Sequence, residues 1–430
     1  MFVLAAYGIL IPMAKMTLSE ELTWRGFVNQ MTFKDIKELD ARKLTFYHGF
    51  DASADSQAVG NLAAMMFDKV FIRHGYKAVL VAGGSTSLIG DPGGKDSERT
   101  LQSEETIAHN VERAKKQLEK IFADDPFTMV NNLDWTKKMT VIEYLRDIGK
   151  HFSMTPLIQR DYIASRIGED GSGMSYAEFS YTLLQGLDYQ YLYDTYGVTL
   201  QLGGSDQWGN CLSGVDLIRR TRGVETHVVT LPLVINKATG KKFGKSEDGA
   251  IWLDPSKTSV YQFYQFWLNI DDAGVGDYLK VYTMIDREEH AKVMTEFEAD
   301  RAGRLAQKTL AYEVTKVVHG KAAADSVKRL SETLFSGTDY SHLKAADFSL
   351  LKAELPNVKV KPGSSLIDAL VATKLASSKG EARRFLESNA IYINGQQIPL
   401  NKDRLDATDA IAGHVVLRRG RNVMAVLELH

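Results

Sequence analysis

The chain has 430 residues, 44% of them hydrophobic and 25% charged, which is the composition of an ordinary soluble globular protein of two or three domains. Cys211 is its only cysteine, which excludes a disulfide framework and a cysteine-based metal site and fits a reducing cytoplasm. The formal net charge is −2, so any contact with nucleic acid must be local; residues 361–430 carry 10 Lys and Arg against 7 Asp and Glu.

We expect residues 1–40 to hold an N-terminal extension and the first helices. Residues 1–13 are apolar, but no basic residue precedes them and they are far too few to cross a membrane. Met1 and Met16 are the two alternative initiators, and we expect no membrane segment.

The next stretch has the pattern of a β-strand, an α-helix and a second β-strand. Residues 44–50 and 77–82 are rich in aromatic and aliphatic side chains, and residues 59–74 between them have helical length and periodicity. This order predicts a parallel sheet with a right-handed crossover. Polar turns follow both strands, at 49–56 and 83–95, where ligands bind in such folds.

Three polar residues share one face of the helix predicted near residues 175–193. Tyr181, Gln185 and Asp188 are spaced at i, i+4 and i+7, and leucines occupy the other side. A solvated helix face would normally carry Lys and Glu, so these residues favour the wall of a polar pocket. Residues 200–210 then predict a short strand, a glycine turn that lets a nucleotide approach the backbone, and Asp206 as an acceptor for ribose hydroxyls.

The pentapeptide Lys242-Phe243-Gly244-Lys245-Ser246 places two cations and a hydroxyl on a loop that glycine lets bend. Such a loop suits a leaving polyphosphate, although a solvated turn is the plainer interpretation of the pentapeptide alone. Neither this loop nor residues 90–95 have the spacing of a Walker A motif, which excludes an ordinary P-loop NTPase.

The C-terminal third divides into a helical part and a separate module. Residues 255–335 are helical in pattern, and two prolines mark a linker before residue 363. In the module, residues 378–381 form a capping box that opens a short helix with Arg383 and Arg384, and Asn394-Gly395 predicts a hairpin turn. Paired arginines suit RNA phosphates, but a plain structural cap is equally compatible with this local pattern.

Together these stretches closely resemble the bacterial tyrosyl-tRNA synthetases, which are class I aminoacyl-tRNA synthetases, over nearly the whole chain from about residue 22. The resemblance rests on residues 47–51, 83–92, 203–210 and 242–246, the helix with Tyr181, and the C-terminal module. It implies an α/β fold: a Rossmann-like parallel-sheet catalytic domain with a dimerisation insertion at 41–254, an all-α anticodon-side domain at 255–338, a linker at 339–362, and a small α+β RNA-binding domain, similar to that of small ribosomal protein S four, at 363–430.

The resemblance also implies a role for each matching residue. The amino-acid pocket would consist of Tyr47 and Asp188 at the phenol, Asp91, Tyr181 and Gln185 at the ammonium, and Gln207 near the carboxylate. The ATP site would consist of Gly49, Asp51, Gly60, Asn61, Gly204, Asp206, Val234, Ile235 and Lys245. The catalytic groups would be the cations Lys95, Arg99, Lys242 and Lys245 at the pyrophosphate, with the hydroxyls of Ser53 and Ser246. Arg383 and Arg384 would contact RNA.

The implied reaction has two steps. Tyrosine attacks the α-phosphate of ATP to give tyrosyl-AMP and pyrophosphate, and the 3′-terminal adenosine of tRNA(Tyr) then takes the tyrosyl group. Neither step needs a protein nucleophile, so catalysis would come from positioning and from cations matched to developing charge. Mg²⁺ would accompany ATP, without a dedicated protein site. The resemblance further implies a homodimer, with tRNA crossing between the subunits.

The chain departs from the family at the His-Ile-Gly-His signature, which here reads Ala58-Val59-Gly60-Asn61. The amide of Asn61 can still donate a hydrogen bond to the nucleotide, but Ala58 cannot. His48 stands beside the expected ribose, where the family has a small residue, and could either compensate or simply fill space.

Three functions therefore remain open: an active tyrosine–tRNA ligase, a slow or inactive relative that binds tyrosine or RNA, and a scaffold reused for RNA binding. The pyrophosphate loop with Lys242 and Lys245 argues against the last two, because a pure binding protein does not need it.

Overall fold

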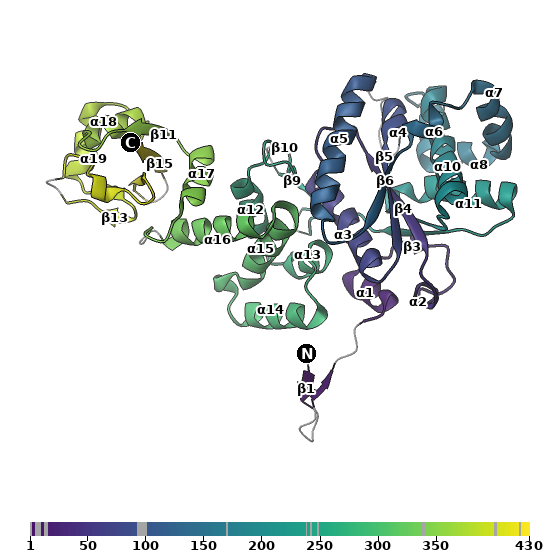
Figure 1. Cartoon of the computed structure of the whole chain (residues 1–430), viewed down its shortest axis with the longest axis horizontal. Coiled ribbons are helices and arrows are strands. Elements are labelled where there is room, and N and C mark those ends of the chain that lie inside the picture. Colours follow the sequence, from purple (N-terminus) through teal and green to yellow (C-terminus); the bar gives the residue numbers. More distant parts are fainter. Residues whose placement is uncertain are drawn as a thin grey trace. The chain divides into compact units, whose positions relative to one another are not determined.

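The computed structural model describes residues 2–4, 10–12, 16–92, 101–168, 171–237, 239–240, 243–246, 249–336, 340–399, 402–420 and 423–430. The chain forms two compact units, whose elements are labelled in Figure 1. The first unit consists of Met1–Asp254 and Asp271–Ala306, and the second of Pro255–Ile270 and Gln307–His430.

A six-stranded sheet forms the centre of the first unit. Its strands lie in the order β3 (Gln30–Met31), β8 (His227–Leu231), β7 (Leu200–Gly204), β4 (Thr45–Asp51), β5 (Lys77–Gly83) and β6 (Phe127–Asn131). All neighbouring strands are parallel except β3, which pairs antiparallel with β8. The predicted parallel sheet is therefore confirmed. The strand order reverses between β4 and β7, which is where open α/β sheets bind their ligands.

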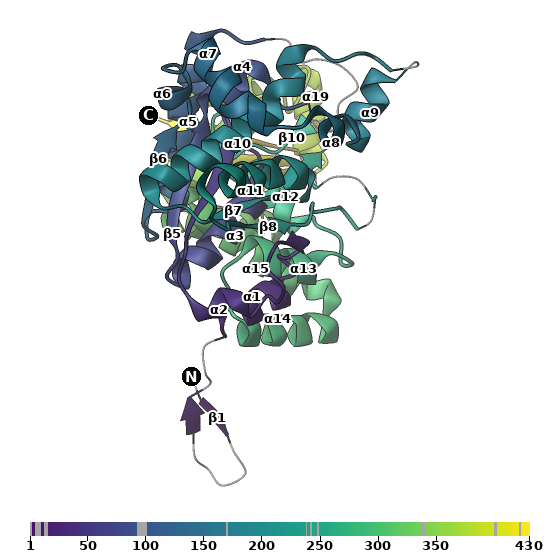
Figure 2. The ribbon, with the colours of Figure 1, turned by 90° about the vertical axis from the view of Figure 1, so that its right-hand side faces the viewer.

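Four long helices cover this sheet (Figure 2): α3 (Val59–Arg73), α5 (Glu104–Ile121), α10 (Tyr176–Tyr196) and α11 (Trp208–Arg222). Successive side chains of β4 point to opposite faces. Phe46 packs on Phe71 of α3, with ring centroids 5.7 Å apart, and Tyr47 packs on Tyr189 of α10, at 5.0 Å. Different helices therefore pack on the two faces of β4.

The ends of α10 explain why the predicted helix forms where it does. The hydroxyl of the N-cap Ser175 accepts a hydrogen bond from the backbone N–H of Glu178, and Gly197 ends the helix in the left-handed conformation at φ 65°. These caps hold the stripe with Tyr181, Gln185 and Asp188 against the carboxyl end of the sheet.

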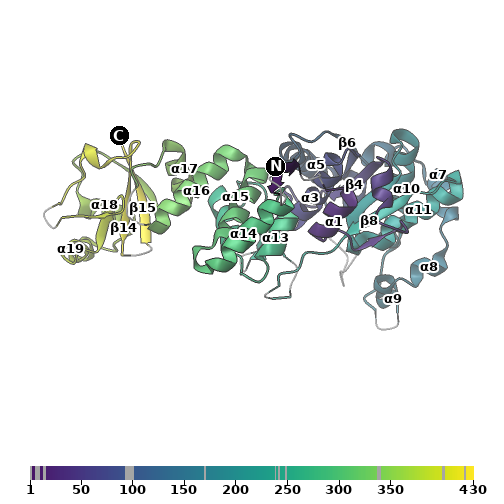
Figure 3. The ribbon, with the colours of Figure 1, turned by 90° about the horizontal axis from the view of Figure 1, so that it is seen from below.

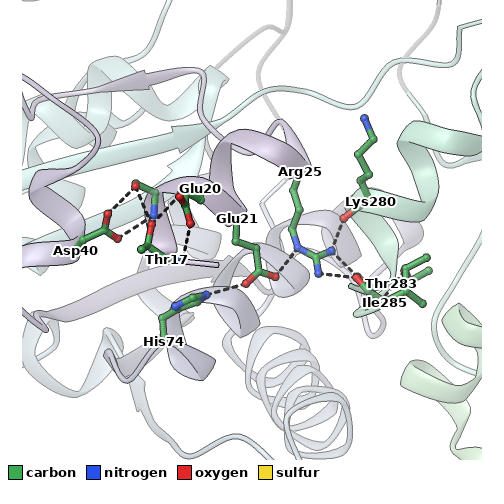
Figure 4. Close-up of polar contacts among 10 residues, drawn as sticks. Thr17, Glu20, Glu21, Arg25, Asp40, His74, Lys280, Thr283 and Ile285 are labelled. Carbon is green, nitrogen blue, oxygen red and sulfur yellow. Dashed lines mark hydrogen bonds and ion pairs between the residues drawn. The ribbon is translucent and has the colours of Figure 1, made fainter. Parts of the chain in front are cut away.

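A buried arginine joins the first helix to a later part of the chain (Figure 4). Arg25 of α1 (Leu18–Arg25) is only 4% exposed and donates hydrogen bonds to the carboxylate of Glu21 and to the carbonyls of residues 280, 283 and 285. Glu21 also bonds His74 at 2.7 Å. These contacts explain why residues 271–306 belong to the first unit, although their helical pattern resembles that of the second.

The remaining elements of the first unit are β1 (Phe2–Leu4), β2 (Leu10–Pro12), α2 (Glu38–Ala41), α4 (Gly84–Ile89), α6 (Leu133–Thr136), α7 (Val141–Glu143), α8 (Met154–Ile158), α9 (Asp161–Ile167), β9 (Lys245–Ser246), β10 (Gly249–Ala250), α13 (Val275–Tyr282) and α14 (Arg287–Ala299), with short helical turns η1 (Tyr144–Ile148), η2 (Gly149–His151), η3 (Ser205–Gln207) and η4 (Arg301–Gly303). None of the helices in the described residues is both long and apolar enough to cross a membrane.

The second unit combines helices with a five-stranded sheet (Figure 3). Its helices are α12 (Val260–Leu268), α15 (Leu305–His319), which starts at the boundary, α16 (Lys321–Ser336), α17 (Ala345–Glu354), α18 (Leu366–Ala372) and α19 (Lys379–Glu387), with the turn η5 (Ala407–Asp409). The sheet has the order β11 (Asn357–Val360), β15 (Val423–Leu429), β14 (His414–Arg419), β12 (Ile391–Ile393) and β13 (Gln396–Gln397).

The predicted hairpin is present, with Asn394 and Gly395 between β12 and β13 at φ 47° and 84°. The predicted capping box is only half formed. Ser378 accepts from the N–H of Glu381 at 3.2 Å, but the Glu381 carboxylate reaches back to Ser377 instead.

The expectation of an irregular linker at 339–362 is wrong. This stretch contains α17 and β11, and β11 pairs in parallel with β15. Phe348 and Leu351 of α17 pack into a cluster with Val416 and Val426 of the sheet. The two prolines flank β11 rather than marking a break between domains.

Candidate active site

A cavity of about 650 Å³ opens at the carboxyl ends of four neighbouring strands. The last residues of β4, β5, β7 and β8 all line it, which places the cavity at the reversal of strand order. Thirteen of the residues proposed from the sequence are in its lining: Tyr47, Gly49, Asp51, Gly60, Asn61, Asp91, Tyr181, Gln185, Asp188, Gly204, Asp206, Gln207 and Val234.

One end of the cavity is buried and built around Asp188. The Asp188 carboxylate accepts hydrogen bonds from Asn132 Nδ2 at 2.9 Å and from Trp135 Nε1 at 2.8 Å. Tyr47 is 2% exposed, and its hydroxyl has no hydrogen-bond partner among the described residues. Because a buried unpaired hydroxyl costs free energy, this end of the cavity fits a ligand that supplies a polar group there.

Burial dominates the electrostatics of this end. It raises the pKa of Asp188 to about 7, although the bonds from Asn132 and Trp135 oppose the rise. Burial also raises the pKa of the Tyr47 phenol well above its usual value, and the nearby Cys211 and Asp188 add to that rise. Tyr47 therefore stays protonated and can serve as a neutral hydrogen-bond donor.

The raised pKa of Asp188 gives a stability prediction. Between about pH 4 and pH 7 the unfolded chain has this carboxyl ionised while the folded protein keeps it protonated, so its contribution to the free energy of unfolding falls as pH rises through that window. We expect Asp188→Asn to remove this loss. Thermal unfolding of both proteins from pH 4 to pH 8 should show the stability of the variant relative to the parent rising up to about pH 7 and then levelling. A relative stability that falls with rising pH would contradict this prediction.

A chain of polar contacts fixes the part of the cavity where Gln207 and Asp91 meet. Gln207 Nε2 donates to Asp91 Oδ2 at 2.7 Å, and Gln207 Oε1 accepts from Asn210 Nδ2 at 3.2 Å. Asn210 Oδ1 accepts a hydrogen bond from the hydroxyl of Thr182. The Thr182 hydroxyl oxygen in turn accepts a hydrogen bond from the Arg160 guanidinium at 3.1 Å. The Gln207 amide is thereby oriented from behind, with its nitrogen toward Asp91.

The other end of the cavity lies where β7 and the start of α3 meet. At Gly204 an added Cβ would come within 2.5 Å of Asp206 Oδ1, so the glycine lets this carboxylate lie close to the backbone. Asn61 Oδ1 accepts the N–H of Ala58 at 3.1 Å, which leaves the amide NH₂ of Asn61 as its remaining donor group.

The lysine loop approaches this same end. Phe243 lines the cavity, and Gly244 has φ 95° with an added Cβ only 2.9 Å from the backbone nitrogen of Gly60. Only glycine permits so close an approach. After it, β9 pairs with β10, so the backbone of Lys245 and Ser246 is placed, whereas Lys242, Lys95 and Arg99 lie outside the described residues.

Two proposed residues lie outside the lining. Ser53 is exposed, and its carbonyl accepts a hydrogen bond from Gln102 Nε2 at 3.0 Å. Ile235 is 43% exposed, and its carbonyl accepts from the hydroxyl of Tyr278 at 3.2 Å. In this structure neither side chain is part of the cavity wall.

Sequence reasoning missed Asn132 and Trp135, which hold Asp188. A signal was present: Asn131 ends β6 and Asn132 directly follows it, so both stand at the same sheet edge as the other polar turns. The strand itself is short and only half buried, which hid it from an analysis of apolar patterns.

Comparison with known proteins agrees with this geometry. The family model described as "tRNA synthetases class I (W and Y)" matches residues 39–336, and that of the "Tyrosine--tRNA ligase SYY-like C-terminal domain" matches residues 347–426. The sheet, the cavity and the first match define a class I aminoacyl-tRNA synthetase. A tyrosine–tRNA ligase of Limosilactobacillus fermentum is 42% identical over 96% of this chain and 100% of that protein, and one of Geobacillus stearothermophilus is 44% identical over 94% and 98%. The chain belongs to the tyrosine–tRNA ligase family, which confirms the resemblance seen in the sequence.

A solved structure supports the same assignment. The C-terminally truncated mitochondrial tyrosyl-tRNA synthetase of Aspergillus nidulans superposes with a TM-score of 0.67 at 30% identity, covering 75% of this chain and 95% of that one.

Proposed function

We propose that this cavity activates L-tyrosine with ATP and then passes the tyrosyl group to tRNA(Tyr). The observation that carries the choice of amino acid is the buried pair at its closed end. The Tyr47 hydroxyl has no partner among the described residues, and Asp188 is an acceptor held in place by two side chains. A phenol hydroxyl can donate to Asp188 and accept from Tyr47, so it satisfies both groups at once.

The other lining residues then take roles along the substrate. Asp91, Tyr181 and Gln185 would hold the ammonium of tyrosine, and Gln207 lies where its carboxylate would follow. Asp206, with Gly204, would bind the ribose, and Val234 would contact the adenine. Catalysis comes from alignment of the reactants and from the lysine loop at the pyrophosphate.

Mg²⁺ is expected to arrive with the phosphates of ATP, whose charge it neutralises when bound. In the parts of the chain that the structure describes, no group of three or more His, Cys, Asp or Glu side chains could hold a metal ion. We propose that the oxygen ligands of Mg²⁺ come chiefly from ATP and water.

The altered signature leaves one alternative, a relative that binds tyrosine but activates it slowly. Ala58 supplies no polar side chain, and its backbone is fixed by an antiparallel bridge to Trp252 and by Asn61. Tyrosine-dependent exchange of pyrophosphate into ATP, measured beside tyrosine binding, separates the two. Binding without exchange would establish the slow or inactive relative.

We further propose that Arg383 and Arg384 of α19 contact tRNA phosphates. Both side chains are exposed, and neither forms an ion pair within the described residues. We expect the double variant Arg383→Glu, Arg384→Glu to charge tRNA about tenfold more slowly. The slope of log affinity for tRNA against log salt concentration should become shallower by about one unit for each phosphate contact that is lost. Pyrophosphate exchange should not change.

The matched control is Arg383→Lys with Arg384→Lys, which keeps the positive charge and should keep most of the charging rate. Equal charging by the glutamate and lysine variants would rule out a phosphate contact at this helix.

The first unit also carries exposed apolar side chains that suit a homodimer. Val141, Ile142 and Leu145 are 72%, 68% and 48% exposed, and Met154 and Tyr176 are 54% and 65% exposed. They lie on α7, η1, α8 and α10, within the predicted dimerisation insertion. A second copy of the chain would remove this surface from water. With a single buried cysteine, the cytoplasm is the compartment we propose.

A further inference from the structure

A carboxylate with no obvious structural purpose lies in the middle of α3. Asp68 is 0% exposed, and its neighbours along the helix, Met66, Phe67 and Val70, are buried apolar side chains. Asp68 Oδ1 bonds His48 Nδ1 at 2.8 Å, and Asp68 Oδ2 has no partner among the described residues. Burial raises the pKa of Asp68, which expresses the cost of holding a charge there.

The stability of the fold does not account for a buried pair such as His48 and Asp68. A buried ion pair or polar pair is often no more stable than two apolar side chains of similar size. In the apolar surroundings of α3 a leucine or methionine would fill the site of Asp68 without desolvating a carboxylate. The pair must therefore be understood from what His48 does.

The position of His48 in β4 connects Asp68 with the cavity. His48 follows Tyr47, so its side chain points to the opposite face of the sheet, toward α3, and it lines the cavity together with Asn61 and Ala64. Asn61, Ala64 and Asp68 are spaced at i, i+3 and i+7 and share one face of α3. Ala64 adds only a small side chain to this part of the cavity wall.

The hydrogen bond fixes how the ring faces this space. With Nδ1 donating to Asp68, Nε2 lies on the far side of the imidazole, and it makes no hydrogen bond to the described residues. A carboxylate on one ring nitrogen of histidine sets which nitrogen carries the proton and holds the ring orientation. Nε2 is thus a polar group with a fixed direction and no protein partner.

We propose that Asp68 is a positioning residue that holds His48 so that Nε2 accepts a hydrogen bond from a ribose hydroxyl of ATP. The inference rests on the proposed function, because it requires ATP to occupy the α3 side of the cavity. It assigns the two successive residues of β4 to different substrates: Tyr47 to tyrosine on the α10 face, and His48 to ATP on the α3 face. Neither His48 nor Asp68 needs to exchange a proton with a substrate for this role.

The test is pyrophosphate exchange by Asp68→Asn and His48→Ala, with KM measured separately for ATP and tyrosine. We expect each variant to lower kcat/KM for ATP about tenfold, to leave the KM for tyrosine unchanged, and to add no further loss when combined. Asp68→Asn should also unfold at the same or a higher temperature than the parent. A residue that only supports the fold would lower the unfolding temperature and leave the ATP kinetics intact, and that result would overturn the proposal.

Two further variants separate an effect on ATP binding from an effect on the fold. Lys69→Met alters the next residue of α3, which is buried and paired with Asp125 away from the cavity, so it should lower the unfolding temperature without changing the KM for ATP. His48→Leu with Asp68→Leu removes both polar groups together and keeps an apolar core. This double variant should fold and show the same loss toward ATP; exchange at the parental rate would refute the proposal. Absence of exchange in the unmodified protein would instead refute the proposed function.

Discussion

Replacing Lys245 by alanine should lower kcat for tyrosyl-AMP formation about 10²- to 10³-fold, the usual effect of losing one charge-stabilising group at a reacting centre. The backbone of Gly244 lies against Gly60, and Phe243 lines the cavity, so the loop starts at the end of the cavity that we assign to ATP. Negative charge grows there as pyrophosphate leaves. Because the lysine acts on that charge, the KM for tyrosine should hardly change.

The assay is pyrophosphate exchange at saturating tyrosine, and Lys242→Ala should behave in the same way. Lys237→Ala is the matched control, because this exposed lysine precedes the same loop but pairs with Asp277. Its kcat should equal that of the parent. A Lys245→Ala protein that keeps kcat but loses tyrosine affinity would show that the loop belongs to the amino-acid pocket.

Replacing Tyr47 by phenylalanine should reduce the preference for tyrosine over phenylalanine. The lost hydrogen bond to the substrate phenol is worth about 1 to 3 kcal/mol, or roughly 5- to 150-fold in kcat/KM for tyrosine. Activity toward phenylalanine should not fall, because that substrate has no hydroxyl to lose. Since the Tyr47 hydroxyl has no partner among the described residues, its removal should not lower the unfolding temperature.

Tyr189→Phe provides the control for this experiment. Tyr189 is fully buried on the same face of the sheet, but its hydroxyl donates to the carbonyl of His227 at 2.8 Å and it is outside the cavity lining. This variant should lose stability and keep the preference for tyrosine. Equal loss of preference in both variants would mean that the effect comes from packing.

The sequence was most informative where the pattern is local. The βαβ unit, the capped helix with Tyr181, Gln185 and Asp188, and the strand before Gly204 all form where their periodicity and turn residues predict them. Each depends on side chains close together in the chain, so hydrophobic period and capping suffice. The residues of the pocket wall were found because they break that period with polar side chains.

The rest depends on contacts between distant segments. Asn132 and Trp135 donate hydrogen bonds to Asp188 from more than fifty residues away in the chain. The periodicity of the helix that carries Asp188 does not predict such distant partners. Sequence reasoning also missed Asp68. A single carboxylate in an apolar helix gives no sign of function until the structure shows His48 bonded to it. Residues 271–306 join the first unit through the carbonyls that bond Arg25, which no periodicity encodes.

The central claim, that this cavity selects and activates tyrosine, is tested most directly by pyrophosphate exchange with the unmodified protein and each of tyrosine, phenylalanine and tryptophan. Phenylalanine would leave both Tyr47 and Asp188 without the phenol, at a cost of about 2 to 6 kcal/mol. The account therefore predicts exchange that depends on tyrosine, with kcat/KM for phenylalanine roughly 30- to 25,000-fold lower and no appreciable exchange with tryptophan. Exchange at similar rates with phenylalanine and tyrosine, or none with tyrosine, would contradict it.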